Sequence, residues 1–560
     1  MNFLDYITII LFSAGIILIG LTFAKRSKKN MRSFFAAGGA VPWQMSGLSL
    51  FMGFFSAGTF VVWGSIAYSL GWVSITIQWT MAIAGFIVGL LIAPRWHETG
   101  VLTAAEYITK RFDIETQKVY TYLFLFISLF TTGSFLYPVA KIIEVSTGLP
   151  LNASILLIGG FCILYVSVGG LWAVMSTDVL QFVILTAVVI IVVPLAINHV
   201  GGVEAFVDRA PDNFFDLADS DYTVGFIIAF GFYNAIFLGG NWAYVQRYTC
   251  VKNKKNSRKV GWLFGLLYII SPLLWMLPPM LYRVVNTSLG GLDNEGAYLL
   301  MCKEVLPTGI LGLMLGGMIF ATASSLNATL NISSGVITND IFKRLRPHST
   351  STMLMKVARI STIGIGILTV IIALLIPLMG GIVNVVISVA ALTGVPLYLP
   401  IIWSLFSKRQ DKTSVLTTTI FSLAVNVFFK FVAPVLFHLS LSRTEEMILG
   451  VLFPIICLAL FEYYYDLVHK KSVQYERYIA MQQIAQGMTL EKDSLEVSDN
   501  NAYSLRIIGY GVGFIGLDII LLGTFSQIGK ILIICIGIFL LLLGSYMIKK
   551  SIIKLYKSND

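Results

Sequence analysis

The feature that most constrains this chain is a series of apolar stretches, each long enough to cross the hydrocarbon core of a bilayer. Within each stretch the apolar residues are continuous and do not alternate with polar ones, which excludes a membrane β-barrel. We therefore predict an all-α integral membrane protein with about fifteen transmembrane helices. The predicted spans are residues 3–24, 43–68, 72–94, 117–146, 151–168, 174–199, 223–246, 259–283, 306–333, 354–377, 379–406, 413–436, 445–465, 504–527 and 530–548.

Composition supports a membrane protein and argues against other classes. Hydrophobic residues make up 57% of the 560 residues and charged residues only 12%, proportions that soluble domains of this size do not have. No Walker A, GxSxG or HExxH pattern occurs, and the five cysteines lack the spacing of a metal site. The five histidines all lie in or beside predicted loops and not together at one depth. Together with the missing motifs, this argues against an enzyme, and the missing Walker A motif argues against an ATP-driven pump.

The distribution of basic residues predicts the orientation in the membrane. Lys and Arg near span ends stay on the cytoplasmic side, and the stretch KRSKKNMR at 25–32 directly follows the first span. The N-terminus should then lie outside, the basic loops 247–258 and 343–353 inside, and the acidic loop 200–222 outside. An odd number of spans returns the C-terminal lysines to the cytoplasm. The net charge of +10 therefore reflects topology in a cell or inner membrane, and we expect no nucleic-acid partner.

Two spans are interrupted by glycine and polar residues near their middle. They read MSGLSLFMGFFSAGTFVVWGSIAY at 45–68 and VGFIIAFGFYNAIFLGGNWAYVQ at 224–246. Both are candidate discontinuous helices, and five spans separate them, which is the spacing expected of two inverted five-helix repeats. The alternative is that the glycines only allow close helix packing.

The segment ATASSLNATLNISS at 321–334 gathers hydroxyl and carboxamide groups inside an apolar span. Ala321, Ser324 and Ser325 share one helix face, where two hydroxyls could serve as ligands of a hard cation such as Na⁺. A neighbouring broken helix could supply further oxygens. The alternative is that these hydroxyls bond back to their own helix. Asp178, an ionisable residue within a span, is a second functional candidate, or else a helix cap.

Other charged residues also lie within predicted spans, such as Lys430 near the end of its span. Lys141 and Glu144 are three positions apart near a span end, where they can pair with each other or reach the interface. Asp518 lies nearer the middle of its span, and the sequence predicts no role for it.

Several stretches together resemble one family. GGLWAVMSTDVLQ at 169–181, AAEYITKRF at 104–112, NWAYVQRY at 241–248 and SSLNATLNISSGVITNDIF at 324–342 are similar, in order and spacing, to the sodium:solute symporter family, which includes the sodium–glucose cotransporters. The resemblance covers residues 35–410. It implies a LeuT-type core of two inverted five-helix repeats and secondary active transport driven by Na⁺.

This resemblance implies a division of the chain into five parts. One helix precedes the transport core, and several helices follow it. The parts are a leading helix with a basic loop at 1–34, the ten-helix core at 35–410, two trailing helices at 411–466, a cytoplasmic linker at 467–503, and a C-terminal helical hairpin with a basic tail at 504–560.

The family binds one Na⁺ between the first and the eighth helices of its core. Matching the motif residue by residue implies that the ligands here are Ala321, Ser324, Ser325 and the backbone carbonyls of Met52 and Phe55. The two hydroxyls are those that the polarity of their segment selects independently.

Some members of the family bind a second Na⁺. The resemblance would place it at Asp178, Ser324 and Asn327, but the next matching position is Ala328, whose side chain offers no oxygen. A hard cation that lacks one oxygen ligand is bound more weakly. We therefore expect one Na⁺ per solute, with Asp178 acting mainly to hold two helices together.

The implied solute site differs from that of the sugar transporters in the family. The resemblance places it at Thr59, Gln78, Asn234 and Tyr268, with Phe237 at the position of an inner aromatic gate. Asn234 agrees with those relatives, whereas the other three replace a glutamine, a glutamate and a lysine. These replaced residues argue against a simple hexose. An acidic solute is not supported either, because the predicted spans place no arginine at mid-depth to bind a carboxylate. We expect a small polar organic solute, with a sugar, sugar derivative or polyol preferred.

The predicted function is a Na⁺-coupled symporter that imports such a solute by alternating access. Na⁺ is the expected cofactor, and the solute and the lipid bilayer are the expected partners, without an obligatory protein partner. Two alternatives stay open. One is an amino-acid or anion symporter of the same fold; the other, from a different class, is a channel or a solute sensor.

Overall fold

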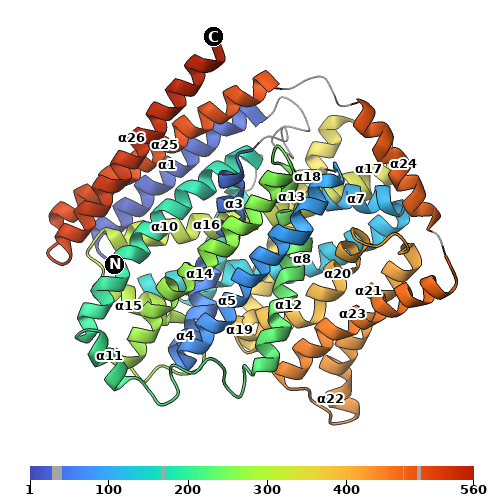
Figure 1. The fold of residues 1–560 in the computed structure, drawn as a ribbon. Helices are drawn as coiled ribbons and strands as arrows, with labels where there is room; N and C mark the ends of the chain where they lie inside the picture. Colours follow the sequence, from blue (N-terminus) through green and yellow to red (C-terminus); the bar gives the residue numbers. More distant parts are fainter. Residues whose placement is uncertain (28–40, 102, 166–170, 471, 489–493, 560) are drawn as a thin grey trace.

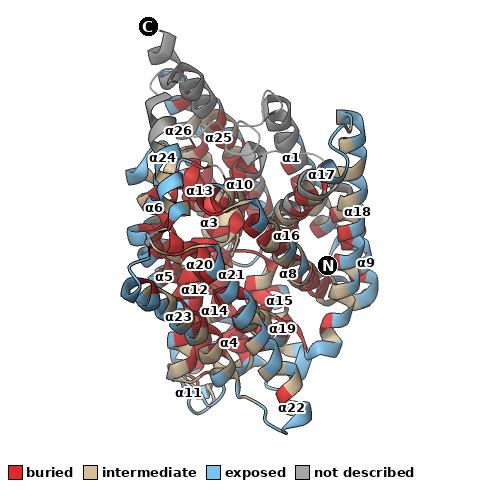
Figure 2. Ribbon diagram, turned by 90° about the vertical axis from the view of Figure 1, so that its right-hand side faces the viewer, coloured by how far each residue is buried: buried red, intermediate tan, exposed pale blue. Residues whose placement is uncertain are grey.

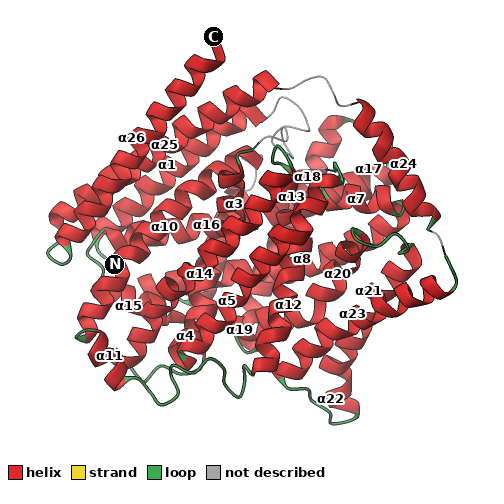
Figure 3. Cartoon of the chain, viewed as in Figure 1, coloured by secondary structure: helices red, strands yellow, loops and turns green. Residues whose placement is uncertain are grey.

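Almost all of the described chain is helical. In the computed structural model, helices are joined by loops and turns, and the described residues form no named β-strand (Figure 3). This confirms the prediction of an all-α protein. The structure describes residues 1–27, 41–101, 103–165, 171–470, 472–488 and 494–559.

Apolar helices occupy every stretch that the sequence predicts to cross the membrane. Within the described ranges, ten helices are long and apolar enough to cross a bilayer, and α12 (Val224–Gly240) with α13 (Trp242–Thr249) forms one further, bent span. Four shorter apolar helices fall in the remaining predicted spans, at Phe3–Ile16, Thr59–Leu70, Leu151–Ile163 and Ile310–Ala323. The chain is therefore a multi-pass membrane protein.

The first five spans of the core begin with a helix in two parts. The first part ends at Met52, and helical structure resumes after the glycine-containing break. A short helix, α7 (Ala104–Arg111), joins the second span to the third. The elements are α3 (Trp43–Met52), η2 (Thr59–Trp63) and α4 (Gly64–Leu70), then α5 (Trp72–Ile87), η3 (Val88–Ile92) and α6 (Ala93–Glu98), followed by α8 (Ile114–Thr147), α9 (Leu151–Tyr165) and α10 (Leu171–Val200).

The second five spans also begin with a broken helix. α12 and α13 meet at an angle of 61°, because the chain passes through Asn241, whose side chain caps α13 by accepting a hydrogen bond from the Ala243 N–H at 3.0 Å. The remaining elements are α14 (Lys254–Val285), α16 (Ile310–Val336), η5 (Ile337–Phe342), α17 (Lys343–Leu345), α18 (Ser351–Leu375), η6 (Ile376–Met379), α19 (Ile382–Val389), η7 (Ala390–Gly394) and α20 (Val395–Ser404).

The helices outside the core pack against its perimeter. α25 begins at Ser494, before the apolar stretch that starts at residue 504, because hydropathy marks the depth of the membrane and not the end of the helix. These helices are α1 (Phe3–Ser27), α21 (Lys412–Val427), η8 (Phe428–Val432), α22 (Ala433–Leu436), α23 (Arg443–Leu467), α24 (Val473–Met488), α25 (Ser494–Phe525) and α26 (Lys530–Asn559).

The two ends of the helix bundle carry different loops. The N-terminus lies at the same end as α11 (Val203–Arg209) and α15 (Ala297–Val305), whereas α7, α17 and α24 lie at the opposite end, toward which the C-terminus points (Figure 1). We call these the acidic end, after the acid-rich loop 200–222, and the basic end. The separation of the termini agrees with an odd number of spans.

Burial is concentrated in the centre of the bundle, where α10 packs against α3, α14 and α16 and α5 packs against α12 and α14, while outward-facing positions are exposed (Figure 2). Many of the exposed side chains are large and apolar, as on α18, where Ile360, Ile363 and Ile367 face outward. Such surfaces suit contact with lipid tails, which are as apolar as the side chains themselves.

The leading helix α1 is joined to α16 by polar contacts. Asp5 Oδ1 accepts hydrogen bonds from the backbone N–H groups of Gly309, at 2.6 Å, and Gly312, at 3.3 Å. The Thr8 hydroxyl donates to the Gly309 carbonyl at 2.9 Å. A Cβ atom at Gly312 would lie 2.1 Å from the Asp5 carbonyl oxygen, so only glycine permits this approach. Asp5 thus caps the first turn of α16 from a different helix.

Candidate sodium and solute sites

The break between α3 and η2 leaves backbone carbonyls available. Gly53 and Phe54 donate to the carbonyls of Leu50 and Phe51, so the backbone turns tightly after α3. Among the described residues, no backbone N–H donates to the carbonyl of Met52 or Phe55. Both residues are buried, and a buried carbonyl without a partner is a ready ligand for a cation.

Helix α16 lies against this break. The Ala57 N–H donates to the Thr322 hydroxyl at 3.3 Å, which ties the start of the helix after the break to the Na⁺-candidate turn of α16. Ala321 is buried, and its carbonyl accepts a hydrogen bond from the Ser325 hydroxyl at 3.3 Å. The back-bonded hydroxyl keeps its oxygen lone pairs, so this contact does not prevent Ser325 from binding a cation.

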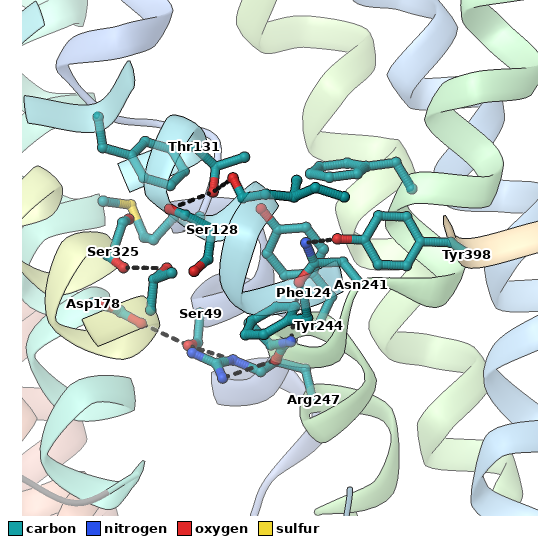
Figure 4. Close-up of a pocket in the computed structure, with 17 residues that line it drawn as sticks. Ser49, Phe124, Ser128, Thr131, Asp178, Asn241, Tyr244, Arg247, Ser325 and Tyr398 are labelled. Carbon is teal, nitrogen blue, oxygen red and sulfur yellow. Dashed lines mark hydrogen bonds between the residues drawn. The ribbon is translucent and has the colours of Figure 1, made fainter. Parts of the chain in front are cut away.

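A cavity with about 870 Å³ of empty volume adjoins Met52, Asp178 and Ser325. We call it the hydroxyl cavity, because hydroxyl groups from α3, α8 and α16 face it (Figure 4). These are Ser49, Ser128, Thr131, Ser325 and Thr329. The structure thus brings together three of the residues predicted to bind Na⁺. The side chains of two others, Ser324 and Asn327, lie outside the described residues.

Asp178 is linked to α3 and α13 through one hydroxyl. Ser49 donates to Asp178 Oδ2 at 2.6 Å, and Arg247 Nε donates to the same Ser49 oxygen at 3.3 Å (Figure 4). All three side chains are buried. Asp178 lies beyond the first turn of α10, which places it away from the N–H groups that a capping residue serves. It joins three helices that surround the hydroxyl cavity.

Arg247 was missed by the sequence reasoning, which placed it in a basic loop beginning at residue 247. In the structure it lies on α13 and lines the hydroxyl cavity, with Nη1 donating to the Ala243 carbonyl at 3.1 Å. The predicted apolar span ends before the first charged residue, Arg247, whereas helix α13 continues past it to Thr249. The arginine in QRY, directly after the predicted span, was the available signal.

A second cavity, with about 1120 Å³ of empty volume, contains every residue predicted to bind the solute. Nine of its lining residues are aromatic, so we call it the aromatic cavity. Among its described lining residues none carries a charge. The predicted residues on its wall are Thr59, Gln78, Asn234, Phe237 and Tyr268.

The polar side chains of the aromatic cavity differ in how far they are satisfied. Asn234 Nδ2 donates to the Thr80 hydroxyl at 2.8 Å, which fixes its carboxamide, and the Thr59 hydroxyl donates to the Phe54 carbonyl. Gln78 is 2% exposed, and its Nε2 has no hydrogen-bond partner in the described structure. A buried donor without a partner is uncommon in folded proteins, so a solute oxygen is a natural partner for Gln78.

Two π-helical turns line the aromatic cavity on opposite repeats. η2 contributes Thr59, Val62 and Trp63, and η7 contributes Ala390 and Thr393. π-Turns are rare and occur mostly at functional sites, because the extra residue releases backbone groups and redirects side chains. Neither turn was predicted, since no residue pattern in the sequence distinguishes a π-turn from a continuous helix.

Phe237 lies between the two cavities and lines both. Its ring contacts those of Phe54 at a centroid distance of 6.2 Å, Tyr244 at 5.7 Å and Tyr398 at 5.7 Å. The Tyr398 hydroxyl accepts a hydrogen bond from Asn241 Nδ2 at 3.3 Å, which fixes it to the bend between α12 and α13. The position of Phe237 suits the inner gate that the sequence assigns to it. Tyr244 follows on the next helix, whereas Phe54 and Tyr398 come from distant segments, and none of these three partners was predicted.

Comparison with known proteins gives the family. The profile of the sodium:solute symporter family matches residues 34–421, which is more than half of the chain. The chain belongs to the sodium:solute symporter family. The symporter is therefore a transporter and not an enzyme, and Na⁺ is its coupling ion.

Individual relatives agree with this assignment. The symporter is 26% identical to a sodium/glucose cotransporter of Vibrio parahaemolyticus, over 82% of this chain and 90% of that protein. It is 28% identical to the sodium/sialic acid symporter SiaT of Proteus mirabilis, over 65% of this chain and 77% of that protein. A solved structure of a Na⁺-coupled sialic acid symporter aligns with a TM-score of 0.69 at 23% identity, over 82% of this chain and 98% of that one. The LeuT-type fold is thereby confirmed.

Proposed function

We propose that the symporter couples the inward movement of Na⁺ to import of a small, neutral, polar organic solute, and that a sugar, sugar derivative or polyol is preferred. The observation that carries this proposal is the aromatic cavity, whose described lining residues carry no charge and include a buried amide donor, Gln78 Nε2, that has no partner among the described residues. Aromatic rings suit the apolar C–H faces of a sugar or polyol, and a few fixed polar groups orient its hydroxyls.

We assign the Na⁺ site to the break in the first core helix and to α16. The proposed ligands are the carbonyls of Met52, Phe55 and Ala321 with the hydroxyls of Ser324 and Ser325. Their support in the structure is that the carbonyls of Met52 and Phe55 accept no hydrogen bond from a described backbone N–H, and that Ala57 lies close to Thr322. Because Thr59 follows the same break and lines the aromatic cavity, an ion bound here would order one wall of the solute site. This shared segment is the proposed basis of coupling.

Alternating access requires one cavity to close while the other opens. Phe237 and its partner rings separate the aromatic cavity from the hydroxyl cavity, so a rotation of these rings would let solute pass toward the basic end. The Asp178–Ser49–Arg247 contact holds α3 and α13, the basic-end halves of the two broken helices, against α10. We propose that this contact loosens when the hydroxyl cavity opens.

The proposed orientation places the acidic end outside and the basic end in the cytoplasm of a cell or inner membrane, in keeping with the positive-inside rule. The N-terminus then lies outside and the C-terminus inside. We also propose that the chain divides into five parts, of which the first four end at residues 34, 410, 466 and 503. We also propose a stoichiometry of one Na⁺ per solute, with Asp178 positioned to join helices.

An acidic solute is the second candidate, because relatives of the symporter transport sialic acid. Arg247 is the cationic side chain that could pair with a solute carboxylate. It lines the hydroxyl cavity, however, and already donates to Ser49 and to the Ala243 carbonyl. A carboxylate in the aromatic cavity would meet no cationic side chain among the described lining residues. Burial of an unpaired carboxylate is costly, which favours a neutral solute.

A thermal-shift screen of the purified symporter tests the proposal. Sugars, sugar derivatives, polyols, amino acids and carboxylates are each added with Na⁺ and with choline in its place. We expect a neutral polyhydroxylated compound to raise Tm only when Na⁺ is present. Gln78→Ala should abolish this shift, while Thr76→Ala, on the same helix but outside the cavity, should retain it. Stabilisation by carboxylates alone would overturn the solute class, and labelled-solute counterflow would separate a carrier from a channel or sensor.

A further inference from the structure

A buried carboxylate lies at the acidic end of the symporter, outside both cavities. Glu295 belongs to η4 (Gly291–Gly296), in the connection from α14 to α15, and is only 4% exposed. Its Oε2 accepts a hydrogen bond from the Tyr137 hydroxyl of α8 at 2.8 Å. Its Oε1 accepts one from the backbone N–H of Ile382, the first residue of α19, at 3.0 Å. Glu295 therefore joins an external connection to two transmembrane helices.

The backbone before α19 is shaped to receive this carboxylate. Gly380 and Gly381 both have positive φ angles, of 86° and 89°. A Cβ atom at Gly381 would lie 2.8 Å from Glu295 Oε1, so a side chain there would displace the carboxylate. No side chain of its own caps α19. Glu295 thus supplies the negative charge that a helix N-terminus favours, from another part of the chain.

The helices that Glu295 joins are two walls of the aromatic cavity. α8 lines it through Thr131, Ser134 and Phe135, shortly before Tyr137. α19 lines it through Val386 and Val389 and continues into η7. Glu295 therefore links the start of α19 to Tyr137, in the half of α8 that leads to the acidic end. Loss of one hydrogen bond to Glu295 breaks the link that this carboxylate makes between the two helices, which also pack directly on each other.

The charges around Glu295 leave it sensitive to protons. On α8, Lys141 pairs with Glu144 at 2.9 Å, and Lys141 and Glu295 border the same small cavity. Burial raises the pKa of Glu295 above that of an ordinary carboxyl group, while the Tyr137 hydroxyl, the Ile382 N–H and Lys141 offset part of this shift and Glu144 adds to it. On η4 and α15 the other charged groups, Asp293, Lys303 and Glu304, are exposed, and Glu115 and Lys118 lie at the opposite end of α8.

We propose that Glu295 is a positioning residue, whose ionised carboxylate holds the start of α19 to the acidic-end half of α8 and whose protonation weakens this link, opening the aromatic cavity toward the acidic end. The proton comes from water and adds to a carboxylate oxygen, which then donates a hydrogen bond where it had accepted one. The protonated carboxyl group accepts one hydrogen bond where the carboxylate accepted two. Because the carboxyl group is now neutral, this remaining bond is weaker. This inference rests on the proposed transport function, because the walls are assigned through the solute cavity.

Hydrogen–deuterium exchange of the full chain in lipid nanodiscs tests this directly, without a solute. Exchange is followed in peptides covering 382–389 of α19 and 131–137 of α8, from pH 8 to about 4, with correction for the intrinsic pH dependence of exchange. As the carboxyl group protonates, protection of both peptides in the wild type should fall about tenfold, as expected when a charge-assisted hydrogen bond is lost. Glu295→Gln should show the low protection at every pH.

Two further variants make the test specific. Asp293→Asn, an exposed substitution on the same turn, should keep the wild-type pH profile. Tyr137→Phe removes one donor to the carboxylate but leaves the Ile382 contact, so it should move the transition to higher pH. A wild-type profile that matches Glu295→Gln at all pH values, or an unmoved transition in Tyr137→Phe, would overturn the proposal. Because no transport is measured, failure of the symport proposal in a flux assay would be a separate result.

Discussion

At the scale of single residues, Ser325 provides the most direct test of the Na⁺ site. Its hydroxyl faces the hydroxyl cavity one turn after Ala321. The double substitution Ser324→Ala with Ser325→Ala should remove two of about five oxygen ligands and abolish Na⁺-stimulated uptake, because a hard cation cannot replace them from apolar surroundings. Ser545→Ala is the matched control, since Ser545 makes the same bond to its own helix on α26. Undiminished stimulation in the double variant would reject the assignment.

Gln78 and Asn234 test the solute site at the same scale. Each substitution to Ala should cost about 1–3 kcal/mol of solute binding, because polar groups of the bound solute would be left without partners. Gln78→Ala should leave Tm of the solute-free protein nearly unchanged, since its Nε2 has no protein partner to lose in the described structure. Asn234→Ala should lower that Tm, because it also loses the Thr80 contact. Isothermal titration and thermal unfolding measure both effects, and wild-type affinity in both variants would exclude this cavity.

At the scale of elements, Asp411 links the start of α21 to the connection after α23. It accepts hydrogen bonds from the Ser414 N–H at 3.0 Å and from Lys470 Nζ at 2.6 Å. Burial alone would raise the pKa of Asp411, but Lys470, Ser414 and Tyr465 outweigh it and lower the pKa. A lowered pKa means that the folded state binds this proton less readily than the unfolded state, so the stabilisation exists at neutral pH and is lost as pH falls through the lowered value.

Asp411→Asn should therefore lower Tm at pH 7, and its difference from the wild type should shrink as pH falls below about 4, where the unfolded carboxyl group protonates. Differential scanning calorimetry between pH 7 and about 3 measures the trend. Asp293→Asn, at an exposed position of η4, should show no such pH-dependent difference. A constant gap between wild type and Asp411→Asn at all pH values would contradict the linkage.

The elements of the core could be predicted because they depend on local sequence. Apolar length places the spans, and Gly53 and the Gly239–Gly240–Asn241 run mark the two breaks. Motif matching brought Gln78, Asn234 and Tyr268 to one wall. The partners of these residues could not be predicted. The contacts of Phe237 with Phe54 and Tyr398, the Ser49–Arg247 contact and the Glu295 contact to α19 join segments far apart in sequence, so only tertiary packing reveals them. The side chains of Ser324 and Asn327 lie outside the described residues.

At the scale of the whole molecule, the two termini lie at opposite ends of the bundle (Figure 1). A reporter fused after Asp560 should be cytoplasmic, because the positive-inside rule assigns the basic end to that side. A second reporter before Met1 should be extracytoplasmic and serves as the internal control. Both reporters on one side would mean an even number of spans, and inverted signals would contradict the proposed orientation.

The central claim is that one Na⁺ drives the import of one neutral solute, and the reversal potential in proteoliposomes measures it most directly. About 100 mV supplies ~2.3 kcal/mol for one charge, and a tenfold Na⁺ gradient adds ~1.4 kcal/mol, enough for accumulation by several hundred-fold. With the solute identified by the thermal-shift screen, the reversal potential should vary with the imposed Na⁺ and solute gradients with the slope of one Na⁺ per solute. A slope of two would place a second Na⁺ near Asp178 and Asn327. Solute flux that does not respond to the Na⁺ gradient would contradict Na⁺ coupling itself.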